Sequence, residues 1–135
     1  MRIAFGTDER TEVTDSITAR LAEWGHEGVV VGEGEPWPDV GRRIGEAVAG
    51  GEAARGVVCC WTGTGVSMAA NKVPGVRAAL CTDAETARGA RRWNDANVLA
   101  LGLRLTTATV AEELLDAFLA SDFDPGEATE IAKLG

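Results

Sequence analysis

Residues 56–72 read GVVCCWTGTGVSMAANK, and this stretch decides the fold. An apolar run ends at Cys60, and the glycines that follow predict a tight turn between a strand and a helix. At the start of a helix, backbone N–H groups have no partners within the helix, so they can hold an anion or an oxyanion. We therefore expect this junction to act on a small anionic or carbonyl-bearing substrate.

Short apolar runs alternate with amphipathic stretches along the chain, which predicts strands at 2–6, 28–32, 56–60, 76–81 and 97–101. Mostly continuous apolar strands separated by helices are typical of a parallel sheet that is covered on both faces. Right-handed crossovers between five such strands give a doubly wound, Rossmann-like α/β fold. In this fold, ligands bind beyond the carboxyl ends of the strands.

Several predicted helices begin at residues that commonly cap helices. Asp39 is expected to cap the helix before the third strand, and Asp83 the helix after the fourth. Either Thr106 or Thr107 is expected to cap the helix after the fifth strand. A further short helix is predicted at the end of the chain.

Composition limits the classes of function. A length of 135 residues fits one domain over 1–135. The net charge of −8 argues against nucleic acid as a partner, because phosphate neutralisation needs clustered cations. No apolar run approaches the roughly 20 residues that span a bilayer, so we expect no membrane contact. The N-terminal segment shows no signal-peptide pattern, and a cytoplasmic location is expected. No Cys/His cluster has the spacing of a metal site.

The two adjacent cysteines are predicted to differ in role. Cys59 and Cys60 should point to opposite sides of the strand, so one belongs to the core and the other faces the cleft. A cysteine at a strand end is often inert packing, yet a helix N-terminus favours the reactive thiolate form. On local grounds, Cys60 is therefore either a core residue or a catalytic thiol.

The other candidates also carry two interpretations. Gly63 and Gly65 form either a structural tight turn or a ligand cradle, to which hydroxyls of Thr62, Thr64 and Ser67 would contribute. Asp8, at the end of the first strand, either caps a helix or binds a substrate hydroxyl. Other residues near predicted strand ends could serve the cleft, or else a turn or a subunit contact: Trp37, Trp93, Asn94 and Asp95.

Two long stretches carry a resemblance to a known family: SMAANKVPGVRAALC at 67–81 and NDANVLALG at 94–102. They resemble type B ribose-5-phosphate isomerases and galactose-6-phosphate isomerase subunits. The resemblance implies a homodimer or a dimer of dimers with active sites between subunits, and no metal or organic cofactor. The tail, 124–135, is then expected to pack at a subunit interface.

The resemblance also implies roles for individual residues. Cys60 would move a proton between C1 and C2 of the substrate through a cis-enediol. The turn from Thr62 to Gly65 would hold the developing oxyanion, as preorganised donors do. Asp8 and Asn94 would contact substrate hydroxyls or the enediolate, and Arg104 would help bind the substrate phosphate.

This sequence departs from the family pattern at several positions. Glu9 and Trp93 stand where the family usually has histidines, the second of which opens the sugar ring as an acid. Trp61 replaces a glycine beside the cysteine, and Glu127 replaces a phosphate-binding arginine. Like charges at about 4 Å cost roughly 4 kcal/mol at an effective dielectric of 20. We therefore expect the pocket to reject a sugar phosphate unless Glu9 and Glu127 point away from it.

These departures lead to a hypothesis about the substrate. We expect an aldose–ketose isomerase that acts on an open-chain or short sugar or hydroxycarbonyl other than ribose 5-phosphate, which is either unphosphorylated or carries its phosphate differently. Glu9 and Trp93 are included among the substrate-binding residues. One alternative is a sugar-phosphate isomerase that retains ribose 5-phosphate and uses Arg104 and Arg10. Another is a non-catalytic ligand- or partner-binding protein, which Trp61 in the turn would favour.

Overall fold

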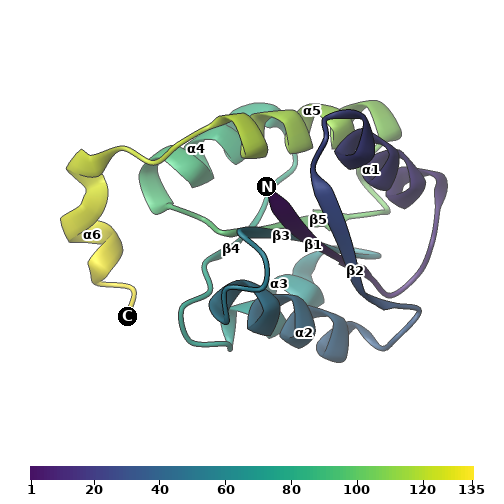
Figure 1. Ribbon diagram of the computed structural model, residues 1–135, viewed down its shortest axis with the longest axis horizontal. Helices are drawn as coiled ribbons and strands as arrows, with labels where there is room; N and C mark the ends of the chain where they lie inside the picture. Colours follow the sequence, from purple (N-terminus) through teal and green to yellow (C-terminus); the bar gives the residue numbers. More distant parts are fainter.

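The computed structural model contains one five-stranded parallel sheet, in the order β2-β1-β3-β5-β4 (Figure 1). The structure describes the backbone of residues 1–135 and all side chains except those of residues 29–32. The strands are β1 (Arg2–Thr7), β2 (Glu27–Glu33), β3 (Arg55–Cys60), β4 (Ala78–Leu80) and β5 (Val98–Gly102).

Helices cover both faces of the sheet (Figure 1). One face packs against α1 (Glu12–Glu23), α4 (Ala84–Asn94) and α5 (Ala108–Ala120). The other face packs against α2 (Trp37–Ala49) and α3 (Thr64–Asn71). The predicted doubly wound α/β fold is therefore confirmed.

Alternation along the strands assigns each side chain to one of the two cores. In β3, Val57 and Cys59 pack with α1, α4 and α5, whereas Val58 and Cys60 pack on the side of α2 and α3. A fully buried aliphatic side chain contributes about 1.5–3 kcal/mol through burial. Both layers are therefore stabilised by the same strand, and the thiol of Cys60 is committed to the α2–α3 side.

Helix α2 packs unusually close to α3. A Cβ atom on Gly41 would lie 2.7 Å from the Val66 carbonyl oxygen, and one on Gly45 would lie 2.9 Å from a Val73 methyl group. Both glycines therefore let the two helices approach each other. This close approach brings the first residue of α2, Trp37, against the first turn of α3.

Most predicted element boundaries agree with the structure to within two residues, and Asp83 and Thr107 cap their helices as predicted. Two expectations are wrong. Asp39 does not cap α2, whose N-cap is Pro36 with no side-chain hydrogen bond. Pro38 in the first turn fixes a helical φ, so α2 begins before Asp39. The fourth strand is also shorter than expected, because β4 lies at the edge of the sheet and pairs only with β5.

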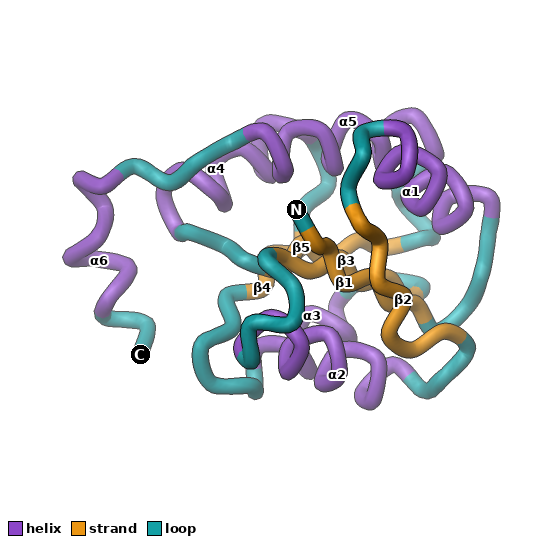
Figure 2. The backbone as a smooth tube through the Cα atoms, in the orientation of Figure 1, coloured by secondary structure: helices purple, strands orange, loops and turns teal.

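The C-terminal segment extends away from the body of the protein (Figure 2). It forms the 3-10 helix η1 (Pro125–Glu127) and α6 (Ala128–Ala132), so the predicted terminal helix is confirmed. None of the residues in these two helices is buried. Within the described part of the chain, no helix combines the length and apolar character that crossing a membrane requires.

Candidate active site

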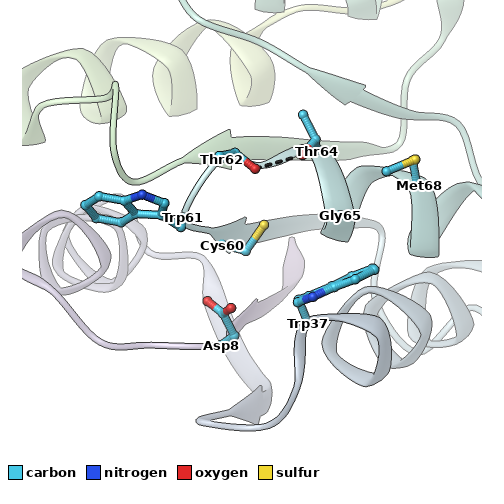
Figure 3. A pocket seen from close by; sticks show the side chains of 8 residues that line it. All are labelled: Asp8, Trp37, Cys60, Trp61, Thr62, Thr64, Gly65 and Met68. Carbon is cyan, nitrogen blue, oxygen red and sulfur yellow. Dashed lines mark hydrogen bonds between the residues drawn. The ribbon is translucent and has the colours of Figure 1, made fainter.

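A pocket of about 370 Å³ opens beyond the carboxyl ends of β1 and β3 (Figure 3). The chain runs from β1 to β2 in one direction along the sheet and from β3 to β4 in the other. Ligands in open α/β folds bind at this reversal of strand order. The lining residues are Asp8, Trp37, Cys60, Trp61, Thr62, Thr64, Gly65 and Met68.

Cys60 faces this pocket, and its neighbour does not. The Cys60 sulfur points toward the space between the turn and Trp37 (Figure 3), although its side chain is only 5% exposed. Cys59 lies on the opposite side of β3 in the apolar layer under α1 and α5, and burial raises its pKa. The prediction that the two thiols point to opposite sides of the strand is confirmed, and Cys60, although buried in the α2–α3 layer, is the one that lines the pocket.

The turn after Cys60 is fixed against the end of β5. Gly63 has a φ of 76°, and a Cβ atom there would lie 2.7 Å from the carbonyl carbon of Leu101. A Cβ atom on Gly102 would meet the Thr62 carbonyl oxygen at 2.6 Å. Only glycine fits the left-handed turn and the close approach at these two positions.

Helix α3 begins at this turn without a side-chain cap. The first amides of a helix have no intrahelical acceptor, so those of Thr64 and Gly65 remain available beside the pocket. The hydroxyl oxygens of Thr62 and Thr64 lie 2.7 Å apart in one hydrogen bond (Figure 3). The turn therefore offers backbone and hydroxyl donors next to the Cys60 thiol, an arrangement suited to a developing oxyanion.

Asp8 provides the acidic wall of the pocket. Its backbone N–H donates to the Cys59 carbonyl oxygen at 3.4 Å, which holds the end of β1 beside β3. The Oδ1 atom of Asp8 is buried and has no hydrogen-bond partner within the described part of the structure. Thr11, rather than Asp8, caps α1. The helix-cap interpretation of Asp8 is therefore excluded, and an unpaired buried acceptor is available to a substrate hydroxyl.

Three apolar side chains complete the walls. The Trp37 indole lies against Gly65, where a Cβ atom would be 2.7 Å from its ring (Figure 3). Met68 follows three residues after Gly65 on the same helix face, a spacing that could have identified it from sequence. Trp61 is 56% exposed, and its indole points away from the Cys60 sulfur (Figure 3), so it does not fill the turn.

Two predicted site residues lie outside this pocket. Trp93 and Asn94 line a second pocket of about 550 Å³ along α4 and β4, which shares no lining residue with the first. The Trp93 indole contacts Gly89 one turn earlier on the same helix, where an added Cβ atom would lie 2.7 Å from its ring. Trp93 is 55% exposed and forms an open apolar platform.

The remaining predicted residues line neither pocket. Gly63 is buried beneath the turn, Ser67 lies partly buried in the first turns of α3, and Glu9 is exposed after β1. Arg104 is exposed, and its backbone N–H donates to the Trp61 carbonyl oxygen at 2.8 Å. The Arg104 side chain forms no ion pair with any side chain that the structure describes.

Arg10 is not available as the second phosphate-binding cation, which the ribose 5-phosphate alternative requires beside Arg104. Its guanidinium contacts Asp15 at 3.0 Å and Glu33 at 3.1 Å, and the hydrogen bond to Asp15 raises its pKa. It lines a different hollow, on the α1 side of the sheet. Among the side chains described, no group of three or more His, Cys, Asp or Glu could hold a metal ion.

The sequence and the fold of this chain are both similar to those of known sugar isomerases. The family model for Ribose/Galactose Isomerase matches residues 3–134. Ribose-5-phosphate isomerase B of Escherichia coli is 35% identical over 130 residues, covering 93% of this chain and 87% of the relative. D-erythrulose-4-phosphate isomerase of Pectobacterium atrosepticum is 35% identical over 142 residues, covering 100% and 93%. The structure of Clostridium thermocellum ribose-5-phosphate isomerase B superposes with a TM-score of 0.94 at 40% identity, covering 100% and 95%.

Proposed function

Because the chain belongs to the ribose/galactose isomerase family of sugar-phosphate isomerases, we propose that it interconverts a four-carbon aldose phosphate and its ketose through a cis-enediol. One observation supports this reaction. The Cys60 thiol faces a pocket between a turn with free amides and the unpaired carboxylate oxygen of Asp8. A base, an oxyanion cradle and a hydroxyl acceptor thus surround one small volume.

The proposed reaction moves one proton and leaves the atoms balanced. The Cys60 thiolate removes a proton from C1 of the ketose, and the electron pair forms the C1–C2 double bond as O2 becomes an oxyanion. Amides of Thr64 and Gly65 stabilise that charge. The Thr62 hydroxyl relays a proton from O1 to O2, and the Cys60 thiol then returns its proton to C2, giving the aldose. A cis-enediol keeps both oxygens on one side, within reach of a single turn.

The lack of a ring-opening acid in the site limits the size of the proposed substrate. Trp93 stands at the position where the family resemblance implies a ring-opening acid, and an indole has no proton to transfer for that step. A four-carbon sugar with its phosphate on O4 has no free hydroxyl to close a five-membered ring, so it needs no such acid. The full-length similarity to D-erythrulose-4-phosphate isomerase supports this choice.

The phosphate is assigned to Arg104. The end of β5 and the turn after β3 are joined by hydrogen bonds, so Arg104 lies beside the pocket wall formed by Trp61. Glu9 and Arg104 are both exposed and neither lines the pocket, so solvent and salt screen the repulsion that the sequence suggested between Glu9 and a phosphate at Arg104. Arg104→Ala should weaken binding of the phosphorylated substrate more than that of its unphosphorylated analogue.

The complete site is proposed to form between two copies of the chain. Cys60 and Asn94 line separate pockets with no common residue, so the two sets of predicted side chains do not meet in one copy. Trp93 and the exposed C-terminal segment would then serve the partner's pocket. Light scattering after size-exclusion chromatography should give a dimer or tetramer, and a monomer with full turnover would contradict this arrangement.

Ribose 5-phosphate remains the second candidate substrate, because the solved relative from Clostridium thermocellum carries that activity in its name and covers the whole chain. The test is a panel of D-erythrulose 4-phosphate, D-erythrulose and ribose 5-phosphate at equal concentration. We expect kcat/KM to be at least about tenfold higher for D-erythrulose 4-phosphate than for the others. Equal or faster turnover of ribose 5-phosphate would refute the four-carbon assignment, and no turnover would favour a non-catalytic protein.

A further inference from the structure

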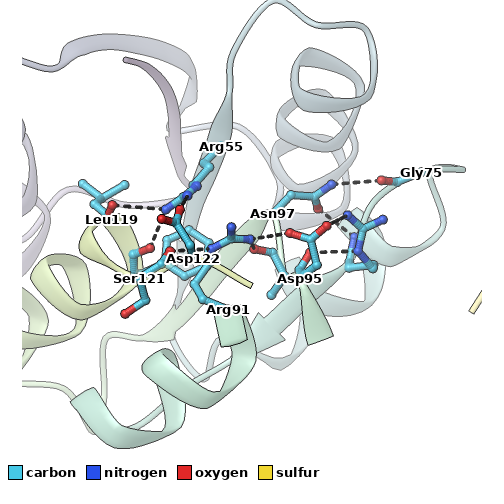
Figure 4. A network of polar contacts seen from close by, with 11 residues as sticks. Arg55, Gly75, Arg91, Asp95, Asn97, Leu119, Ser121 and Asp122 are labelled. Atoms are coloured by element: carbon cyan, nitrogen blue, oxygen red, sulfur yellow. Dashed lines mark hydrogen bonds and ion pairs between the residues drawn. The ribbon is translucent and has the colours of Figure 1, made fainter. Parts of the chain in front are cut away.

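We propose that Asp95 is a positioning residue. Through its ion pairs with Arg77 and Arg91, it holds Asn94 in place and fixes the position at which the C-terminal segment begins (Figure 4). The proposal rests on the proposed function, in which Asn94 and the C-terminal segment, 124–135, complete a site. It concerns a residue that touches neither pocket, since Asp95 lines neither of them.

The backbone of Asp95 ends α4 in an unusual conformation. Its φ of 47° is the only positive value among the described non-glycine residues. The Asp95 N–H donates to the Arg91 carbonyl oxygen at 3.2 Å, and the Ala96 N–H donates to the Ala90 carbonyl oxygen at 3.0 Å. A side chain in the left-handed region persists where surrounding contacts determine it. Asn94 is the residue immediately before this turn, so its placement depends on the same contacts.

The Asp95 carboxylate supplies those contacts. Arg91 donates to Oδ1 at 2.8 Å, and Arg77 donates to Oδ2 at 3.1 Å and to the Asp95 carbonyl oxygen at 2.8 Å. The Arg91 side chain is only 7% exposed, so it needs this counter-charge. With both oxygens engaged, the carboxylate is not free for a ligand. The interpretation of Asp95 as a turn residue therefore replaces its interpretation as a site residue.

The same arginine reaches the end of α5. Arg91 donates to the Ser121 carbonyl oxygen at 3.2 Å, and Arg55 donates to the Phe118 carbonyl oxygen at 2.6 Å (Figure 4). These bonds satisfy carbonyl groups that the last turn of a helix leaves without partners. The Asp124 N–H then donates to the Arg92 carbonyl oxygen at 2.8 Å. Helix α4 thus holds the chain at the point where the C-terminal segment leaves the body.

One carboxylate therefore anchors two elements that the proposed site needs. Without it, Arg91 keeps its bonds to the carbonyl oxygens of Ala96 and Ser121 but has no carboxylate to balance its buried charge, so the turn after Asn94 and the end of α5 should both loosen. A displacement of 1 Å at a site residue can lower turnover by about 10²-fold. The effect on Asn94 should therefore be visible in kinetics as well as in local dynamics.

The chain offers a matched control. Asp116 pairs with Arg20 at 2.6 Å, and the exposed fractions of these side chains, 29% and 26%, match those of Asp95 and Arg77, 28% and 26%. The Arg20–Asp116 pair joins α1 to α5 and includes no residue of either pocket. Asp116→Asn therefore removes a comparable ion pair without affecting the proposed positioning.

Hydrogen exchange and kinetics on Asp95→Gly, Asp95→Asn and Asp116→Asn test the proposal. Glycine keeps the left-handed backbone and removes the carboxylate, whereas asparagine keeps one acceptor oxygen. Asp95→Gly should accelerate exchange at least tenfold in residues 92–97 and 118–126 and lower kcat/KM about 10- to 100-fold. Asp95→Asn should lie between wild type and Asp95→Gly, and it carries the comparison if Asp95→Gly does not fold. Asp116→Asn should change exchange in α1 and the neighbouring part of α5, but leave exchange in residues 92–97 unchanged and kcat/KM within about twofold of wild type.

The two readouts separate this proposal from the proposed function. Unchanged exchange in both segments, exchange that rises equally throughout the protein, or wild-type kcat/KM in Asp95→Gly would each overturn the positioning role. Failure of the wild-type protein to turn over any sugar phosphate would instead overturn the proposed function. Faster exchange confined to the two segments would still support the structural anchoring by Asp95 in that case.

Discussion

The substitution Gly65→Ala should separate activity from stability. The added Cβ atom would lie 2.7 Å from the Trp37 ring, so the indole must move by about 0.7 Å to restore an ordinary 3.4 Å contact. Trp37 is 45% exposed and can move outward at small cost. Alanine in place of glycine contributes about 0.5–1 kcal/mol of stability in the middle of a helix and less at Gly65, the second residue of α3. The variant should therefore keep or gain thermal stability while its pocket wall is displaced.

The expected loss of activity follows from that displacement. Misplacement by about 1 Å can cost about 10²-fold in rate, so Gly65→Ala should lower kcat/KM for D-erythrulose 4-phosphate by about 10- to 100-fold. A double-mutant cycle with Trp37→Ala isolates the cause. In the Trp37→Ala background, Gly65→Ala should add almost no further loss. Wild-type kcat/KM in the single variant would refute the reasoning, and a full additional loss in the double variant would assign the effect to the methyl group itself.

Three further predictions concern thiols and the tail. Iodoacetamide at pH 8 should label Cys60 before Cys59 and Cys81, because burial raises the pKa of both other thiols, that of Cys81 to about 11; peptide mass spectrometry that finds Cys81 labelled first would contradict this order. As pH rises from about 9 to 11, the unfolded chain ionises Cys81 while the folded protein keeps it protonated, so the free energy of unfolding should fall by up to about 1.4 kcal/mol per pH unit; urea titrations should show a shallower fall in Cys81→Ala. Deletion of residues 124–135 should leave thermal unfolding nearly unchanged, since η1 and α6 bury none of their residues, but should lower kcat/KM at least about tenfold if the segment serves a second copy; equal activity in the truncated protein would argue against that role.

The sequence was sufficient to predict the fold because local signals agreed with one another. Apolar runs, helical spacing and the capping residues Asp83 and Thr107 all indicated the same doubly wound sheet. The predicted helix cap at Asp39 was wrong because Pro38 starts α2 earlier, and a proline in the first turn can override a nearby capping residue. The opposite directions of Cys59 and Cys60 followed from strand alternation alone.

The geometry of the site was less predictable from the sequence. The contact of Trp37 with Gly65 joins residues far apart in the chain, and it depends on how closely α2 packs against α3. The engagement of Arg10 by Asp15 and Glu33 likewise depends on where β2 lies relative to α1. The direction of Trp61, away from the Cys60 sulfur, is also a property of the folded turn (Figure 3). Such contacts are set by tertiary packing and leave no local pattern.

The most direct test of the central claim follows the proton that Cys60 is proposed to move. The protein is incubated with D-erythrulose 4-phosphate in D₂O, and NMR measures aldose formation and deuterium at its C2. Wild type and Cys59→Ala should both form the aldose, with deuterium at C2 in every turnover in which the Cys60 thiol exchanges its proton with D₂O before returning it, whereas Cys60→Ala should lose at least about 10²-fold in the rates of aldose formation and of deuterium uptake. Cys60→Ala that forms the deuterated aldose at the wild-type rate would contradict the assignment of Cys60 as the base.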